Sequence, residues 1–238
     1  MSLHPLFTLG ARLRLCADMV RPATKLADIG TDHAYLPIWL AKQELISRAI
    51  AADINLGPIR SAQKNIERYH VQDIVSARLS DGLNAIFPFE ADDIVLAGMG
   101  GELIIQIITA APWLKDEHKR LVLQPMTSVQ QLREFLADQK FAVCREQAVI
   151  EDGRVYTALM VQYSPSGVKI DELYPYIGKL NNQTEENRAY MRLRVINLEK
   201  KSHGLLLTGK NEESAALDIM IGKIKEMIEM GEKDAFDR

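Results

Sequence analysis

Two carboxylates flank a glycine turn near the amino terminus of this chain. The stretch DIGTDHAYLP (28–37) places Asp28 and Asp32 around Gly30, and His33 follows. A glycine turn between a strand and a helix is typical of nucleotide-binding loops, yet Asp32 and His33 occupy the place of the second glycine. Nearby carboxylates would repel a pyrophosphate and would attract a cation. The loop therefore favours a positively charged ligand over a dinucleotide.

Two more acidic residues follow later strands of the expected sheet. Asp53, with Ile54 after it, comes about twenty residues beyond Gly30, where an acidic residue accepts hydrogen bonds from ribose hydroxyls. Asp81 precedes Gly82 and is suited to the exocyclic amine of an adenine. An exposed strand end also tolerates Asp, and Asp-Gly is often only a turn.

A glycine-rich turn, AGMGG (97–101), completes the set. Its first four residues, Ala97, Gly98, Met99 and Gly100, would let the backbone approach a ligand where a Cβ atom would collide. A tight turn into the next helix is the alternative, and the two are compatible. A nucleoside with positive charges and no phosphate fits all these positions. S-adenosylmethionine, with its sulfonium and amino groups, is such a ligand.

Alternating apolar runs and helical patterns predict the elements that hold these residues. Continuous apolar runs, typical of buried parallel strands, occur at 25–29, 48–53, 74–79, 93–97 and 120–124. Helical patterns lie between them at 35–44, 57–70, 101–111 and 128–139. Asn55 precedes one helix, and Ser128 with Gln131 has capping-box spacing. Two further strands at 141–150 and 154–163 flank an Asp-Gly turn. We expect an α/β fold with a Rossmann-like, mostly parallel methyltransferase sheet ending in an antiparallel hairpin.

The composition changes near Ser164-Pro165, which predicts one domain over residues 1–164 and a helical domain over 165–238. Helical patterns lie at 171–181, 184–203 and 212–230, and the last two should form an antiparallel pair. This pair could be a packing or dimer element. It could also be a substrate arm, because basic residues recur on it at Arg188, Arg192, Arg194, Lys200 and Lys201.

Composition narrows the class of protein. The chain has 238 residues, 47% of them hydrophobic, and a net charge of -3, which excludes a uniformly cationic surface. Two distant cysteines and five scattered histidines, His4 among them, predict neither a disulfide framework nor a metal site. No apolar stretch reaches the roughly 18 residues of a membrane span, and MSLHPLFTLGARLRLC does not resemble a signal peptide. We expect a cytoplasmic protein, and the sequence leaves its oligomeric state open.

Four segments resemble the bacterial tRNA (adenine(22)-N1)-methyltransferases: ADIGTDHAYLPIWL (27–40), AADIN (51–55), SDGL (80–83) and AGMGGELI (97–104). The resemblance extends over essentially the whole chain, including LQPM (123–126). It implies S-adenosylmethionine as donor, N1 of adenine 22 in the D-arm region of tRNA as acceptor, and a small coiled-coil-like helical domain after the catalytic one. It also implies that the cofactor loop is 28–33 and the methyl-facing turn 97–101.

The residues are consistent with a ring-nitrogen acceptor. Enzymes that methylate exocyclic amines commonly carry an Asn/Asp-Pro-Pro-aromatic tetrad after the fourth strand, where this chain has Ala97 to Gly100. Adenine N1 loses no proton on attack, so alignment could supply most of the catalysis. Asp32 could stabilise the cationic product, and Tyr35 could stack on a flipped base. Tyr35 could equally pack a helix face with Trp39, and His33 could contact the cofactor or cap the helix.

Basic side chains supply candidate contacts to RNA phosphates. The candidates are Arg12, Arg14, Arg21, Lys25, Arg60, Lys64, Arg68, Arg188 and Arg192. Two alternatives to the tRNA enzyme stay open, namely a methyltransferase acting on another RNA and a non-catalytic RNA-binding relative. Loss of cofactor binding in an Asp53→Ala variant would favour a methyltransferase.

Overall fold

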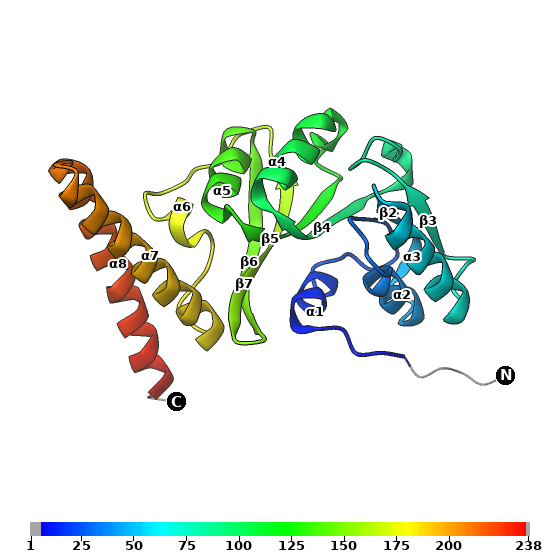
Figure 1. Cartoon of the computed structure of the whole chain (residues 1–238), viewed down its shortest axis with the longest axis horizontal. Coiled ribbons are helices and arrows are strands. Elements are labelled where there is room, and N and C mark those ends of the chain that lie inside the picture. Colours follow the sequence, from blue (N-terminus) through cyan, green and yellow to red (C-terminus); the bar gives the residue numbers. More distant parts are fainter. Residues whose placement is uncertain (1–5, 237–238) are drawn as a thin grey trace.

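The computed structural model describes residues 6–236, with side chains through residue 233, and is built around one seven-stranded sheet (Figure 1). The strands are β1 (Thr24–Ile29), β2 (Ile46–Asp53), β3 (Val75–Leu79), β4 (Asp93–Gly100), β5 (Arg120–Thr127), β6 (Phe141–Glu151) and β7 (Arg154–Tyr163). Their order in the sheet is β3-β2-β1-β4-β5-β7-β6. The first five strands are parallel, and β7 is antiparallel to both of its neighbours.

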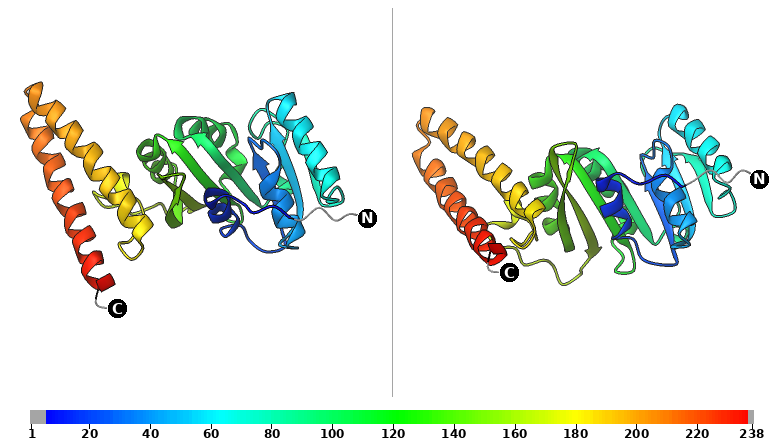
Figure 2. Two further views of the ribbon diagram at one scale, coloured as in Figure 1. Left: turned by 60° about the horizontal axis from the view of Figure 1, so that its bottom comes forward. Right: turned by 90° about the horizontal axis from the view of Figure 1, so that it is seen from below.

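Helices cover both faces of the sheet, as the views in Figure 2 show. The helices are α1 (Ala11–Ala17), α2 (Tyr35–Lys42), α3 (Leu56–Arg68), α4 (Gly101–Ala110), α5 (Val129–Asp138), α6 (Tyr174–Ile177), α7 (Glu185–Leu207) and α8 (Asn211–Phe236). One apolar core packs α1, α2 and α3 against the sheet, and a second packs α4 and α5 against the opposite face. Strands buried on both faces explain the continuous apolar runs in the sequence. The predicted fold class is confirmed.

Two local expectations were wrong. The helix expected over 171–181 is reduced to α6 (Tyr174–Ile177), because Gly178 adopts a φ of +62° directly after it and ends the helix. The capping box at the start of α5 does not form. Ser128 has a left-handed backbone, and its hydroxyl donates to Glu102 Oε1 at 3.3 Å instead of capping the helix.

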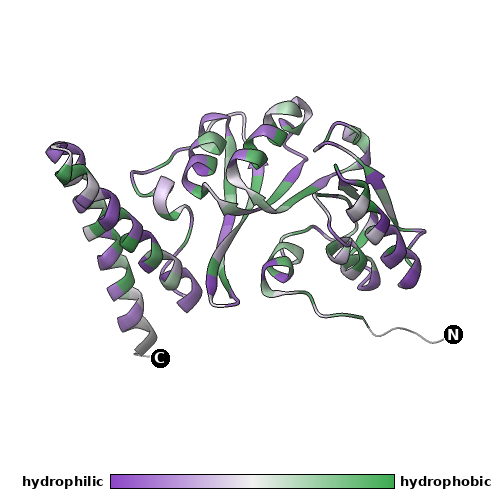
Figure 3. Ribbon diagram, in the orientation of Figure 1, coloured by the Kyte–Doolittle hydropathy of each residue, from purple (hydrophilic) through white to green (hydrophobic). Residues whose placement is uncertain are grey.

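The two long carboxyl-terminal helices form the expected antiparallel pair beside the β6 edge of the sheet (Figure 1). Their apolar faces meet in a third core, and Figure 3 shows hydrophobic and hydrophilic segments alternating along both helices. This core contains Met191, Val195, Leu198, Leu217, Ile221, Ile224 and Ile228. Thr184 caps α7 by accepting the Asn187 N–H at 3.2 Å. The domain boundary at residue 164 stays a prediction. Across residues 6–236, no helix combines the length and apolar character needed to cross a membrane.

Strand β6 connects the sheet to this helical pair. At its free edge, the Ala148 N–H donates to Asn187 Oδ1 of α7 at 2.9 Å, so a helix covers an edge that would otherwise be unpaired. Side chains of β6 alternate between the two faces. Arg145 and Glu151 contact the α1 side, whereas Glu146 lies against α5.

Candidate functional site

The carboxyl ends of β1 and β4 border a cavity of about 330 Å³. Parallel strands leave their carboxyl ends at one edge of a sheet, where α/β folds bind ligands. The cavity is lined by Arg12, Leu13, Asp28, Gly30, Thr31, Asp32, His33, Tyr35, Leu36, Ala97 and Gly98. It therefore brings together two of the predicted carboxylates, Asp28 and Asp32, with Gly30 and Gly98 of the two glycine turns and with Tyr35.

The loop after β1 is held by backbone hydrogen bonds. The N–H groups of Gly30 and Thr31 both donate to Ala52 O, at 2.8 and 2.9 Å, and fasten the loop to β2. Gly30 has a φ of +76°, and a Cβ atom there would collide with the Met99 methyl group. The backbone conformation therefore favours glycine at this position, whereas the flexible Met99 side chain could move to accept a Cβ atom. The Met99 side chain lies over this glycine and is not among the residues that line the cavity, and its predicted contact with the cofactor stays a prediction.

The two acidic residues of the loop differ in environment. Asp28 is buried, and burial raises the pKa of its carboxyl group to about 6, although a hydrogen bond with Thr31 acts in the opposite direction. The Asp32 side chain is 77% exposed, and its Oδ2 lies 3.1 Å from His33 Nε2. A bound cation would stabilise ionised Asp28 at low dielectric, whereas solvent screens Asp32.

The glycines after β4 serve different purposes. Gly98 has a φ of +76°, and a Cβ atom built on it would point into open space beside the cavity. Its N–H donates to Gln124 Oε1 at 3.1 Å. At Gly101 a Cβ atom would lie 2.6 Å from Ser128 O, so this glycine permits close packing of α4. Open space and close packing thus occur at different glycines of one segment. Gly100, between them, lies outside the cavity lining.

The remaining predicted cofactor residues stand along the same edge of the sheet. Asp53 Oδ1 accepts the Asn55 N–H at 2.7 Å, and the Ser80 N–H donates to Asp53 O at 2.9 Å. The second contact places Asp81 and its neighbour beside the end of β2. Gly82 has a φ of +53°, and Ile54, Asp53's neighbour, is exposed. None of these residues lines the cavity itself. They lie at or just after the carboxyl ends of β2 and β3.

An aromatic cluster borders the cavity, and the sequence indicated only part of it. Tyr35 is 40% exposed, and its ring centroid lies 5.2 Å from that of His33 at an interplanar angle of 29°. The Phe7 ring packs 4.7 Å from Tyr35 and 5.2 Å from Tyr69. Phe7 is an isolated aromatic residue before the first helix, and nothing in the sequence around it indicated a contact with Tyr35.

The predicted RNA-contacting residues are dispersed. Arg12 lies in the cavity wall, and Arg14 stacks on Trp39 with its guanidinium 4.6 Å from the ring centre. Arg60 and Lys64 are exposed on α3. Three others are engaged elsewhere: Arg21 pairs with buried Asp93, Arg188 is buried against Asn182 and Glu185, and Arg192 pairs with Glu185 and Glu232. These engagements disfavour Arg21 and Arg188 as RNA contacts. His4 lies outside the described residues.

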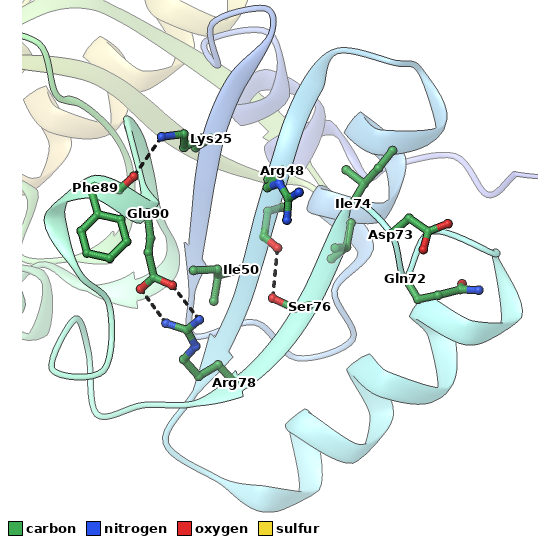
Figure 4. Close-up of a pocket in the computed structure, with 12 residues that line it drawn as sticks. Lys25, Arg48, Ile50, Gln72, Asp73, Ile74, Ser76, Arg78, Phe89 and Glu90 are labelled. Carbon is green, nitrogen blue, oxygen red and sulfur yellow. Dashed lines mark hydrogen bonds and ion pairs between the residues drawn. The ribbon is translucent and has the colours of Figure 1, made fainter.

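A second cavity of about 350 Å³ lies at β2 and β3, away from these carboxylates (Figure 4). Arg78 and Glu90 form a bidentate ion pair across it, and Lys25 Nζ donates to Phe89 O at 3.0 Å. The predicted cofactor residues lie elsewhere, so we place the functional site at the first cavity.

Known proteins share this architecture. The chain matches the family of methyltransferase domains over residues 9–159. It is 38% identical over 154 residues to the tRNA (adenine(22)-N(1))-methyltransferase of Bacillus subtilis, and the match covers 65% of each chain. The chain thus spans just under two thirds of the length of this curated relative.

Solved structures are similar to this chain over more of its length. Streptococcus pneumoniae Sp1610 superposes with a TM-score of 0.81 at 31% identity, covering 93% of this chain and 100% of that one. The same protein in complex with S-adenosyl-L-methionine gives 0.73 at 32% identity, covering 91% and 98%. TrmK of M. capricolum, in complex with S-adenosyl-homocysteine, gives 0.75 at 25% identity, covering 94% and 99%. The chain therefore belongs to the methyltransferase domain family and, within it, to the bacterial tRNA (adenine(22)-N1)-methyltransferases.

Proposed function

We propose that this chain transfers a methyl group from S-adenosylmethionine to N1 of adenine 22 in tRNA. The observation that carries the proposal is the cavity in which Asp28 and Asp32 stand beside the turns at Gly30 and Gly98. Carboxylates at this place attract a sulfonium and an ammonium group, and they would repel a pyrophosphate. The cofactor complexes of the two structural relatives support this donor, and the name of the Bacillus subtilis relative supports this acceptor.

The donor site would extend along the strand ends. One carboxylate oxygen of Asp53 accepts the Asn55 N–H, and we assign the other to the ribose hydroxyls. Exposed Ile54 offers an apolar surface to the adenine ring, and Asp81 with Gly82 would contact its polar edge. The donor's methyl group would then face the turn at Gly98.

Adenine N1 requires little proton chemistry from the protein. The bound donor supplies an electrophilic methyl group on a sulfonium. The N1 lone pair forms the new bond as the sulfur–carbon bond breaks, the sulfur keeps the electron pair, and the positive charge passes to the base. No proton leaves N1, so the protein must mainly align the base and exclude water. We assign base stacking to Tyr35 and stabilisation of the cationic product to Asp32, whose exposure limits its contribution.

The partner would be tRNA bound through its D-arm region. N1 of a paired adenine is hidden, so the base must leave its stack to reach the cavity. Arg14, Arg60 and Lys64 are exposed and are the candidates we retain for phosphate contacts. We propose that the protein acts in the cytoplasm, because the substrate of the enzyme would be tRNA.

Methyl transfer to unmodified bacterial tRNA tests the proposal. The product nucleoside and its position are determined by mass spectrometry, and the matched control is a transcript in which guanine replaces adenine 22. We expect N1-methyladenosine at position 22 and no product with the guanine transcript. Methylation at another position would overturn the assignment of the acceptor and would leave the assignment of the donor unchanged. Failure to bind S-adenosylmethionine would overturn both.

A further inference from the structure

Arg12 brings a guanidinium into a cavity whose other charged side chains are acidic. Among the described residues that line this cavity, Arg12 is the one arginine or lysine, whereas Asp28 and Asp32 supply carboxylates. Arg12 and Asp28 both act electrostatically on one neighbouring group, the Cys16 thiol. The pKa of the buried Cys16 thiol is raised to about 12 mainly by burial, with a further rise from Asp28 and an opposing effect of Arg12.

The Arg12 side chain is held in place before any ligand binds. Its Nε group forms an ion pair with Glu151, and its backbone N–H donates to Glu151 Oε1 at 3.2 Å. Its Nη1 group donates to Gln124 Oε1 at 3.0 Å, and the guanidinium lies 5.0 Å from the centre of the Tyr156 ring. Within the described chain, its Nη2 group makes no hydrogen bond. One edge of a fixed guanidinium is therefore free to bind an anion.

Gln124 links Arg12 to the turn after β4. Gln124 is fully buried, and the same Oε1 atom that accepts from Arg12 also accepts the Gly98 N–H at 3.1 Å. Its Nε2 group donates to Pro125 O at 3.1 Å, which fixes the orientation of the amide. The Oε1 atom of Gln124 thus positions both the Arg12 guanidinium and the backbone of the turn at Gly98.

The charges of the cavity match an amino-acid zwitterion. Asp28 and Asp32 suit the ammonium and sulfonium groups of the proposed donor, but they would repel the carboxylate of its methionine portion. A guanidinium binds a carboxylate through charge-assisted hydrogen bonds of defined geometry. An RNA phosphate at this place would meet the same repulsion from the two aspartates. The charges therefore favour the donor's carboxylate.

We propose that Arg12 binds the α-carboxylate of the donor's methionine portion, and that Glu151 and Gln124 are the residues that position it. This inference rests on the proposed function, since it names the group that recognises one end of the proposed donor. It reassigns Arg12, which the sequence suggested as an RNA contact.

Calorimetry on the full chain tests the assignment with two ligands. S-adenosylhomocysteine contains the carboxylate, and its decarboxylated analogue keeps the adenosine, sulfur and amine. We expect the wild type to prefer S-adenosylhomocysteine by about ten- to a hundredfold, and Arg12→Gln to lose this preference by weakening that ligand alone. Arg12→Lys should restore part of it, because lysine keeps the charge and loses the planar fork.

Arg48→Gln is the matched control, because Arg48 lies beside the second cavity and should leave both affinities unchanged. Circular dichroism and thermal unfolding verify that each variant is folded. Equal weakening of both ligands by Arg12→Gln would show a merely structural role and overturn the proposal. Unchanged ligand affinities with a raised KM for tRNA would assign Arg12 to an RNA phosphate instead. A wild type that binds neither ligand would overturn the proposed donor itself.

Discussion

Arg133 and Glu146 form an ion pair in which both side chains are fully buried, with Nη2 2.5 Å from Oε1. Arg133, on α5, also donates to the carbonyl groups of Pro175 and Tyr176, at 3.2 and 2.9 Å. Glu146, on β6, accepts the Lys179 N–H at 2.9 Å. The pair therefore joins the sheet to the segment that leads into the carboxyl-terminal helices.

Removal of one partner should destabilise the protein strongly. Glu146→Ala leaves a buried guanidinium without its counterion, and we expect the free energy of unfolding to fall by about 3–5 kcal/mol. Urea denaturation measures this loss. The exposed pair of Lys210 and Glu213 provides the control, because Lys210→Gln should change the free energy by less than about 0.5 kcal/mol. Similar losses in both variants would contradict a special role for the buried pair.

Asp28 should make the stability of the ligand-free protein depend on pH. Its pKa is about 6 in the folded state, against about 4 for an unperturbed carboxyl group. The folded state therefore retains a proton that the unfolded chain releases, and the free energy of unfolding should fall as pH rises from about 4 to about 6. We expect Asp28→Asn to remove this fall and to stabilise the protein at pH 7.5 by up to about 3 kcal/mol.

Urea denaturation at pH 4.5 and 7.5 tests this prediction. Asp28→Asn should gain little at pH 4.5, where Asp28 is already largely protonated. Asp73→Asn, at an exposed acid, is the control and should show no such difference. An equal gain for Asp28→Asn at both pH values would mean that burial does not disfavour the Asp28 carboxylate.

Asp53 should be needed for cofactor binding and not for folding. Asp53→Ala removes the acceptor that we assign to the ribose hydroxyls, so we expect affinity for S-adenosylhomocysteine to fall at least about tenfold. Within the protein the side chain makes a local bond to the Asn55 N–H, and the melting temperature should change little. Calorimetry and thermal unfolding separate the two effects. An unchanged affinity would contradict this assignment and would mean that the ribose binds away from the end of β2.

Tyr35 should act on the RNA and not on the cofactor. Stacking of a base on an aromatic ring contributes about 1–3 kcal/mol, so Tyr35→Ala should reduce kcat/KM for tRNA by about 5- to 150-fold. Tyr35→Phe keeps the ring and should stay near wild type. Methylation kinetics at varied tRNA concentration measure these effects. A matching loss of S-adenosylhomocysteine affinity would identify Tyr35 as part of the donor site.

Residues placed by the strand pattern were predictable, and residues joined only by side-chain contacts across the fold were not. Asp28, Gly30, Asp32 and Gly98 lie at or just after strand ends, and parallel strands bring those ends together. The contacts of Arg12 with Gln124 and Glu151 span 112 and 139 residues of chain, and no local pattern encodes them.

Charge on a side chain likewise does not reveal its partner. The sequence suggested Arg21 and Arg188 as RNA contacts, but both guanidinium groups bond within the protein. The end of α6 was missed for a different reason. The apolar residues around it fit a helical period, and the left-handed backbone of Gly178 outweighs that pattern.

The alternation of side chains along β6 limits how this family can vary. Glu146 meets Arg133 on one face of the strand, and Glu151 meets Arg12 on the other, five positions later. Deleting or inserting one residue between them would reverse the face of one acid and separate it from its arginine. We therefore expect insertions and deletions to be excluded from 147–150 in functional homologues, and changes of length to accumulate beyond Glu151, in the turn of the hairpin.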